Sequence, residues 1–253
     1  MRLMDFPLLV LFVSFLLQFL AAQLGDQFRK RILPLEEEER DDYGVVLGAT
    51  LTLLGLLIGF SFSMAVSRYD QRKNYEEAEA NAIGTEYLRA DLLPLDDATR
   101  VRELLRRYTD LRVLFYTTRA PQRIAKINAD TAQLQNELWS AVRPAAAAQP
   151  TAAVVALAVS GMNDVLNSQG YTQAAWWDRI PIAAWLLMGT IAICCNLLIG
   201  YGAHRRDWRI FLILPVAVSI AFFLISDIDS PRGGPIHVAP QNLENLSQSL
   251  PAQ

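Results

Sequence analysis

The chain of 253 residues has few of the residues that build metal sites or disulfide frameworks. Its two cysteines, Cys194 and Cys195, are adjacent, which excludes a disulfide framework and a cysteine-based zinc site. Its two histidines, His204 and His237, lie far apart and lack the spacing of metal ligands. Charged residues make up only 19% of the chain, and the net charge of −3 gives no reason to expect a nucleic-acid partner.

Catalytic motifs are absent from the sequence as well. It contains no P-loop, no glycine pattern for nucleotide binding, no nucleophile elbow and no metal-site motif. The glutamates that follow one another on a predicted helix do not by themselves form the cleft that acid–base catalysis requires. We therefore expect a protein that is not an enzyme and that uses no metal and no cofactor.

Apolar residues are abundant, at 52% of the chain, and they are concentrated in four stretches without charge. Each stretch has about the length of a membrane-spanning helix, and backbone polar groups in lipid must bond within the segment. The sequence thus predicts four transmembrane helices in two hairpins, over residues 6–24, 44–66, 182–201 and 210–226. The first stretch lacks the small-residue pattern of a signal-peptide cleavage site, which favours a retained helix.

The polar region between the hairpins is predicted to be helical. No proline occurs between Leu35 and Leu93, so we expect the second membrane helix to continue as one helix over 44–93. Asp96 or Asp97 is expected to cap the next helix. Apolar spacing predicts three further helices, with residues 144–150 as a connector after the second. These three helices cover residues 98–118, 122–143 and 152–168.

No stretch shows the sustained period-two alternation of a strand, so we expect an all-α membrane protein without a sheet. The expected organisation is a first transmembrane hairpin over 1–66, an extramembrane helical domain over 67–180, a second hairpin over 181–227 and a tail over 228–253. Basic residues do not decide its orientation. The charges beside the first helix favour an outward amino terminus, whereas Arg68, Arg72 and Lys73 favour a cytoplasmic domain.

The second apolar stretch carries two patterns on different faces. Gly55 and Gly59 form a G-x-x-x-G motif, which lets a helix of the same chain or of another subunit approach closely. Thr52, Leu56 and Phe60 recur every four residues and form one stripe. The stripe is either an ordinary face toward lipid or core, or, in a ring of subunits, a hydrophobic constriction that gates by dewetting.

Charged residues follow where this helix leaves the apolar stretch. Arg68 and Arg72 share a face and fit three interpretations: helical ion pairs, anchors for lipid headgroups, or a cationic vestibule that concentrates anions. One turn later, Glu76, Glu77 and Glu79 are expected to be solvated.

Other polar residues have structural interpretations. The acidic run over 36–42 is predicted to be a solvated loop, because like charges repel and stay hydrated. Asn196, inside the third apolar stretch, is predicted to hydrogen-bond between helices. Asp227 and Asp229 are predicted to cap the exit of the last span, with Arg232 as the nearest candidate partner.

Three strings of residues resemble the bacterial bestrophin-like domain family: LLIGFSFSMAVSRYDQR, EAEANAIGTEYLRADLLP and DIDSPRGGPI. Similarity to true bestrophins lies mainly in the second membrane helix, at Gly59-Phe60 and Ser67-Arg68-Tyr69. Bestrophins are pentameric anion channels with four spans per subunit and a cytosolic helical region. The resemblance implies that Thr52, Leu56 and Phe60 match their apolar neck, although Thr52 replaces an apolar residue.

We therefore expect an oligomeric anion channel of the bacterial inner membrane, with the second helix lining the pore. Arg68 and Arg72 would form the anion vestibule, and Gly55 and Gly59 would pack against a helix. Expected partners are membrane lipids, small anions and further copies of the chain, with the termini and the helical domain in the cytoplasm. The alternative is a non-conducting membrane scaffold or signalling protein whose helical domain binds a partner and whose stripe is buried within one subunit.

Overall fold

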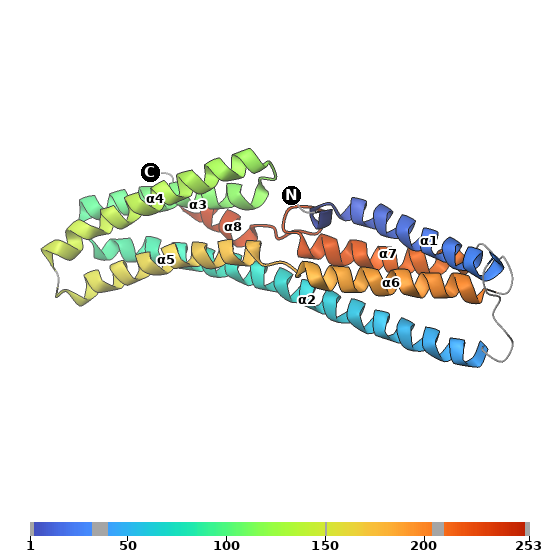
Figure 1. Ribbon diagram of the computed structural model, residues 1–253. Helices are drawn as coiled ribbons and strands as arrows, with labels where there is room; N and C mark the ends of the chain where they lie inside the picture. Colours follow the sequence, from blue (N-terminus) through green and yellow to red (C-terminus); the bar gives the residue numbers. More distant parts are fainter. Residues whose placement is uncertain (1–2, 32–39, 150, 204–209, 251–253) are drawn as a thin grey trace. The chain divides into compact units, whose positions relative to one another are not determined.

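The computed structural model describes residues 3–31, 40–149, 151–203 and 210–250, and the regular structure within these ranges is helical (Figure 1). This confirms the all-α prediction. The elements in chain order are η1 (Leu3–Asp5), α1 (Pro7–Arg31), α2 (Arg40–Arg89), η2 (Ala90–Leu92), α3 (Leu95–Thr117), α4 (Pro121–Ala148), α5 (Ala153–Trp177), α6 (Ile182–Gly202), α7 (Ile210–Asp229) and α8 (Gln241–Ser249).

Within the described residues, four helical stretches are long and apolar enough to cross a membrane. They are Pro7–Arg31, Arg40–Leu92, Ala153–Gly202 and Phe211–Asp229. The four predicted spans coincide with α1, the first part of α2, α6 and α7, apart from Phe6, which precedes α1. The apolar runs therefore located these helices correctly, because an uncharged run of this length forms its backbone hydrogen bonds most simply as a helix.

Contacts divide the chain into two compact units. The first comprises Met1–Tyr69 and Arg179–His237, and the second comprises Asp70–Asp178 and Val238–Gln253. Helix α2 contributes residues to both units, as the absence of proline from this stretch predicts. The membrane boundaries at residues 66, 180 and 227 stay predictions.

The core of the first unit lies among α1, α2, α6 and α7. Its buried residues include Val10, Leu54, Ala65, Trp185, Met188, Ala192, Val218, Phe222 and Ile225. Large apolar side chains on the other faces of these helices are exposed, among them Leu8, Phe12, Leu186 and Ile213. Helices with apolar residues on both the buried and the exposed face suit a hydrocarbon surrounding, because the exposed side chains then contact lipid.

Helices α1 and α6 approach each other so closely that two positions require glycine. A Cβ atom at Gly25 would collide with the backbone of Leu197 and Tyr201, and one at Gly200 would collide with the backbone of Ala22. Glycine lacks this atom, so the two backbones can pack directly against each other, as small residues allow between membrane helices.

A buried polar chain links three membrane helices. Asn196 Nδ2 on α6 donates hydrogen bonds to Gln18 Oε1 on α1 at 3.1 Å and to the Ala192 carbonyl at 2.8 Å. Gln18 Nε2 in turn donates to Ser219 Oγ on α7 at 3.3 Å. The interhelical role predicted for Asn196 is thus confirmed, and its partners are the polar residues that α1 and α7 carry among apolar neighbours.

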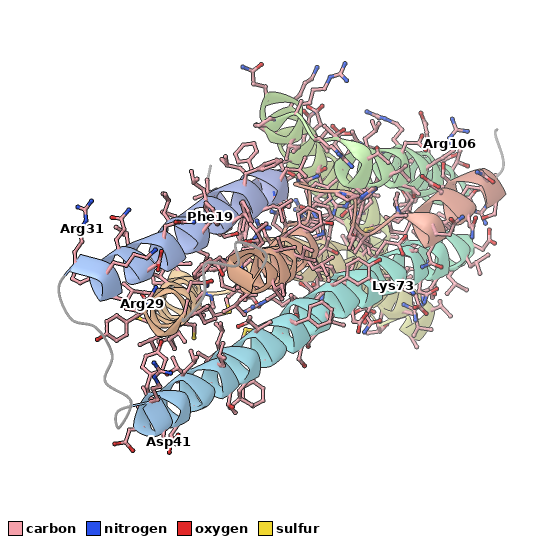
Figure 2. The ribbon with its side chains drawn as sticks, turned by 90° about the vertical axis from the view of Figure 1, so that its right-hand side faces the viewer. Phe19, Arg29, Arg31, Asp41, Lys73 and Arg106 are labelled. Carbon is pink, nitrogen blue, oxygen red and sulfur yellow. The ribbon has the colours of Figure 1, made fainter. Side chains whose placement is uncertain are left out.

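Charged residues gather at the ends of the apolar helices. Arg29, Lys30 and Arg31 lie in the last turn of α1, where Arg29 and Lys30 pair with Asp26. Asp41 lies in the first turn of α2, and Figure 2 labels it together with Arg29 and Arg31. Cations at a helix C-terminus and anions at a helix N-terminus complement the helix dipole, so these charges stabilise both ends.

The second unit is built from α3, α4 and α5 together with η2, α8 and the latter part of α2. Apolar residues of α3 recur at helical spacing, and Val101, Leu105, Tyr108 and Phe115 are buried. Trp176 on α5 packs against Phe115, with 4.8 Å between the ring centroids. The amphipathic spacing of α3 therefore predicted its inward face correctly.

Two predictions about α3 and α4 were wrong. The N-cap of α3 is Pro94, so Asp96 and Asp97 lie inside the first turn of the helix. Their negative charges interact favourably with the positive end of the helix dipole, but neither residue caps the helix. Helix α4 continues through Pro144 to Ala148, so most of the predicted connector is helical. Alanine has the highest helix propensity, and the four alanines after Pro144 extend α4 beyond the proline.

Helix α5 is longer than its apolar spacing predicted, because it runs to Trp177 and not only to Ser168. The added turns carry Thr172, Ala175 and Trp176, whose side chains are buried. Tertiary packing supplies most of the stability of such a helix, and a single-segment pattern does not reveal that packing.

Candidate functional site

The predicted pore stripe lies on an exposed face of α2. Leu56 is 52% exposed and Phe60 is 62% exposed, whereas Leu54 and Ala65 on the same helix are buried in the core of the first unit. Helix α2 thus turns one apolar face toward its own unit and leaves a second apolar face open. An apolar face of this kind requires lipid or another protein surface to cover it.

Thr52 fits the stripe although it is a polar residue. Its side chain is exposed, and its Oγ1 donates a hydrogen bond to the Gly48 carbonyl of the same helix at 2.9 Å. Because the hydroxyl donor is satisfied by the helix backbone, the hydroxyl needs no donor contact with lipid or water. The departure from an apolar residue at this position is therefore compatible with an apolar lining.

Gly55 and Gly59 are also exposed, and a Cβ atom at either would meet nothing within 4 Å in the described part of the chain. This contrasts with Gly25 and Gly200, where backbone of the neighbouring helix leaves no room for a Cβ atom. Close packing within the chain therefore uses a different pair of glycines. The role of Gly55 and Gly59 in helix packing stays a prediction, and it concerns a partner outside the described chain.

The two arginines predicted to form an anion vestibule are mostly buried. The Arg68 side chain is 14% exposed, and its Nη1 lies 4.0 Å from Asp229 Oδ1 at the end of α7. Arg72, in the second unit, is 1% exposed. Since neither guanidinium stands open in solvent, any effect on passing anions would act mainly through the electric field of the charge.

A cluster of ion pairs lies at one end of the first unit. Arg179 donates a hydrogen bond to the Asp229 carbonyl at 3.0 Å, lies 3.6 Å from the Asp229 carboxylate and pairs with Asp5. The backbone N–H of Ile180 donates to the same carboxylate of Asp229 at 3.2 Å. These bonds join η1, the start of α6 and the end of α7. The ion pairs of Asp229 with Arg179 and Arg68 were not predicted, because both partners lie far away in sequence.

The residues after α7 fold around Asp227. Its Oδ2 accepts a hydrogen bond from the Ile236 N–H at 3.3 Å, and a Cβ atom at Gly234 would collide with its carboxylate. Ser226 Oγ donates to the Met4 carbonyl at 2.8 Å, which ties this exit to the amino-terminal residues. The string DIDSPRGGPI is therefore a compact turn that buries its two carboxylates.

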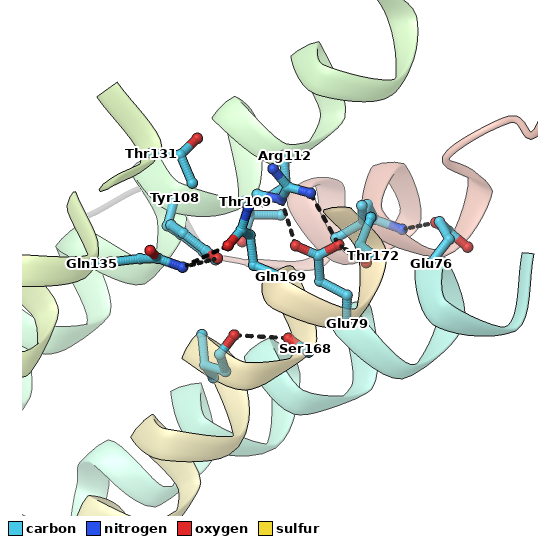
Figure 3. A network of polar contacts seen from close by, with 12 residues as sticks. Glu76, Glu79, Tyr108, Thr109, Arg112, Thr131, Gln135, Ser168, Gln169 and Thr172 are labelled. Carbon is cyan, nitrogen blue, oxygen red and sulfur yellow. Dashed lines mark hydrogen bonds and ion pairs between the residues drawn. The ribbon is translucent and has the colours of Figure 1, made fainter. Parts of the chain in front are cut away.

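A second polar cluster lies inside the second unit (Figure 3). Glu79 on α2 and Arg112 on α3 form an ion pair whose side chains are both fully buried. Thr172 Oγ1 on α5 donates to Glu79 Oε2 at 3.0 Å, so one carboxylate joins three helices. Burial opposes the charged guanidinium, but the charge and hydrogen bonds of Glu79 outweigh this and raise the pKa of Arg112.

Glu76 holds the start of α8. Its carboxylate accepts hydrogen bonds from the Leu243 N–H at 2.9 Å and from Asn242 Nδ2 at 2.7 Å. A carboxylate at a helix N-terminus satisfies backbone donors that have no partner within the helix. The prediction that Glu76 and Glu79 are solvated was therefore wrong, whereas Glu77 is exposed as expected.

Other sequence predictions fall on residues without a described structure. Residues 36–39 of the acidic run and His204 lie outside the described residues. Within the described ranges, the structure contains no group of three or more His, Cys, Asp and Glu residues that could hold a metal ion.

Comparison with solved structures shows the fold. A variant of a bacterial bestrophin homologue from Klebsiella pneumoniae superposes with a TM-score of 0.64 at 15% sequence identity, covering 96% of this chain and 97% of that chain. Another crystal structure of a bestrophin homologue from the same organism gives 0.63 at 15% identity, covering 96% and 99%. A further variant from this organism gives 0.65 at 15% identity, covering 96% of both chains.

A comparison with curated proteins found no match. The Bestrophin-like domain family matches residues 10–243, which include α2, the polar cluster of the second unit and the turn after α7. The match covers most of the chain and agrees with the three strings of residues that carry the resemblance. This chain belongs to the Bestrophin-like domain family.

Proposed function

We propose that the chain is one subunit of an oligomeric anion channel in the bacterial inner membrane, with α2 lining the pore. The observation that carries the proposal is the exposed apolar stripe of α2, opposite a face that is buried in its own unit. In a ring of subunits around one axis, such a stripe from each copy would form a narrow apolar constriction. A constriction of this kind gates by dewetting, because water leaves a narrow apolar passage.

The glycines beside the stripe suit such an assembly. Gly55 and Gly59 leave the backbone of α2 accessible on one side, and small residues let membrane helices of neighbouring subunits approach closely. The proposed assembly would thus cover two surfaces of α2 that the described chain leaves open. In this proposal the second unit and both termini lie in the cytoplasm.

The arginines would favour anions through their field. Arg68 keeps partial exposure at the end of the apolar stretch, although Asp229 offsets part of its charge. Asp70, Lys73 and Glu77 are the exposed charged residues that follow on α2, and the two carboxylates among them weaken the preference for anions that the arginines would produce. The reversal potential of the current under a potassium chloride gradient tests this part of the proposal, because it separates anion from cation selectivity directly.

The proposal as a whole is tested with purified protein in liposomes loaded with an anion-sensitive dye. We expect anion flux above that of empty vesicles. The rate of this flux should stay the same when potassium is replaced with a large impermeant cation. Vesicles that stay at the level of empty vesicles over a range of pH and calcium concentration would reject a channel.

Replacing the large side chains of the stripe with alanine should widen the constriction. We expect Leu56→Ala and Phe60→Ala to increase anion leak roughly tenfold, the effect of lowering the barrier to permeation by about 1.4 kcal/mol. Leu186→Ala on α6 and Phe12→Ala on α1 are matched controls, because these side chains are 64% and 66% exposed in the same unit. A leak that rises equally in the controls would indicate general loosening of the protein and not a gate.

Crosslinking separates a pore from the scaffold alternative. Leu56→Cys, in a chain whose Cys194 and Cys195 are replaced by alanine, should form crosslinks between copies of the chain if the stripe surrounds a common axis. Leu186→Cys should form far fewer, since its face would contact lipid. Residue 56 that forms no more crosslinks between copies than residue 186 would contradict the pore lining and favour the scaffold.

A further inference from the structure

Glu86, near the end of α2, is buried without a hydrogen-bond partner among the described residues. Its side chain is 0% exposed, and neither of its carboxylate oxygens has a hydrogen-bond partner among the described residues. It differs in this respect from Glu76 and Glu79 on the same helix, which accept hydrogen bonds from α8 and from α3 and α5. A buried carboxylate without such bonds is strongly disfavoured as an anion.

The surroundings of Glu86 leave little space for water. Gly161 on α5 packs directly onto it, and a Cβ atom at Gly161 would collide with Glu86 Oε2 and lie 2.5 Å from Arg89 Nη1. The glycine thus allows α5 to approach α2 at the height of this carboxyl. If Glu86 became charged, hydrating it would require α5 to separate from α2 at this point.

Two charged groups act on Glu86, one from each of the helices that meet here. They are Arg89 on α2, which favours the charged form, and Asp164 on α5, which opposes it. Asp164 is exposed and Arg89 is half-buried. Solvent therefore screens both charges and weakens their effect on Glu86, which is itself buried. Burial is the dominant effect and raises the pKa of Glu86 to about 8.

We propose that Glu86 carries a proton in the folded second unit near neutral pH, and that the contact between α2 and α5 is a pH-sensitive switch that weakens as the solution becomes alkaline. Glu86 is the switch residue, and Gly161 and Asp164 are the residues of α5 that respond to its charge. The proposal does not depend on ion conduction.

The sign of the effect follows from the two protonation equilibria. When the contact is open, Glu86 is solvated and has an ordinary glutamate pKa. When it is closed, the pKa is higher. Between these two values only the closed form holds the proton, so the closed form loses stability as the pH rises. The opening equilibrium should increase about tenfold per pH unit in this window and level off above pH ~8.

Hydrogen exchange of the full-length protein in detergent tests the switch. The ratio of exchange rates between wild type and Glu86→Gln is measured for α5 around Gly161 at each pH, which cancels the chemical pH dependence of exchange. We expect the ratio to rise about tenfold per unit between pH ~5 and pH ~8. Glu77→Gln, which changes an exposed glutamate of the same helix, should behave like wild type. A ratio that stays constant over this range would overturn the proposal.

Infrared spectroscopy provides a second test that does not require the Glu86→Gln variant to fold. Wild-type protein should show the carbonyl stretch of a protonated, buried carboxylic acid at pH ~6 and lose it by pH ~10, on either side of a pKa of about 8. Asp164→Asn should move this transition to lower pH, because it removes a negative charge that opposes ionisation. A carboxyl that is already ionised at the lower pH would also overturn the proposal.

Discussion

Replacing Arg112 with alanine should lower the free energy of unfolding of the second unit by about 3–5 kcal/mol. The substitution would leave the Glu79 carboxylate fully buried without its cation, with the Thr172 hydroxyl as a remaining donor. Removing one partner of a buried ion pair is far more damaging than removing both, because the other charge remains in a medium of low polarity. Tryptophan fluorescence reports the loss, since Trp176 lies in the adjoining aromatic cluster.

The control for this prediction is Arg107→Ala on the same helix. Arg107 is 55% exposed and lies 4.0 Å from Glu137, so its ion pair is screened by solvent and should contribute only ~0–1 kcal/mol. The double variant Glu79→Gln with Arg112→Met should recover much of the lost stability, because it removes both charges. An Arg112→Ala variant as stable as Arg107→Ala would show that the buried pair contributes little.

The second large effect concerns the close approach of α1 and α6. We expect Gly200→Ala to destabilise the first unit by about 3 kcal/mol, because the added methyl group would collide with the backbone carbonyl of Ala22. A flexible side chain could move aside, but backbone in the middle of a helix cannot, so the two helices would have to separate along much of their length.

Gly189→Ala on the same helix is the matched control. A Cβ atom at Gly189 meets nothing within 4 Å in the described structure, and alanine is a better helix former than glycine. We therefore expect Gly189→Ala to be neutral or slightly stabilising when thermal unfolding is followed in detergent. Equal melting temperatures for the two variants would contradict the tight crossing at Gly200.

The hydropathy of the chain located the membrane helices well, while the polar residues were harder to interpret. Glu76, Glu79 and Glu86 recur at intervals of three and seven residues and share a face of α2 with the buried Ile83. This spacing was a usable signal for a buried face. It was missed because charged residues in a helix are normally solvated, and only a partner elsewhere in the chain reverses that expectation.

The stripe of Thr52, Leu56 and Phe60 illustrates the opposite case. Its periodicity alone does not distinguish a pore lining from a lipid-facing or a core surface, and the resemblance to bestrophins favoured the pore lining. The stripe is exposed within the described chain, so lipid, another copy of the chain or a partner protein would have to cover it. A surface that faces other copies of the chain is not encoded in the periodicity of one helix.

The sequence by itself determined the membrane helices, the all-α class and the continuity of α2, because these depend on local properties: apolar run length, the positions of prolines and helical spacing. Only the tertiary structure decided which charged residues are buried. Glu79 finds Arg112 across 33 residues and Thr172 across 93, and Glu76 reaches the start of α8 across 167. Electrostatic stabilisation of a buried charge depends on distance in space, and distance along the chain does not reveal it.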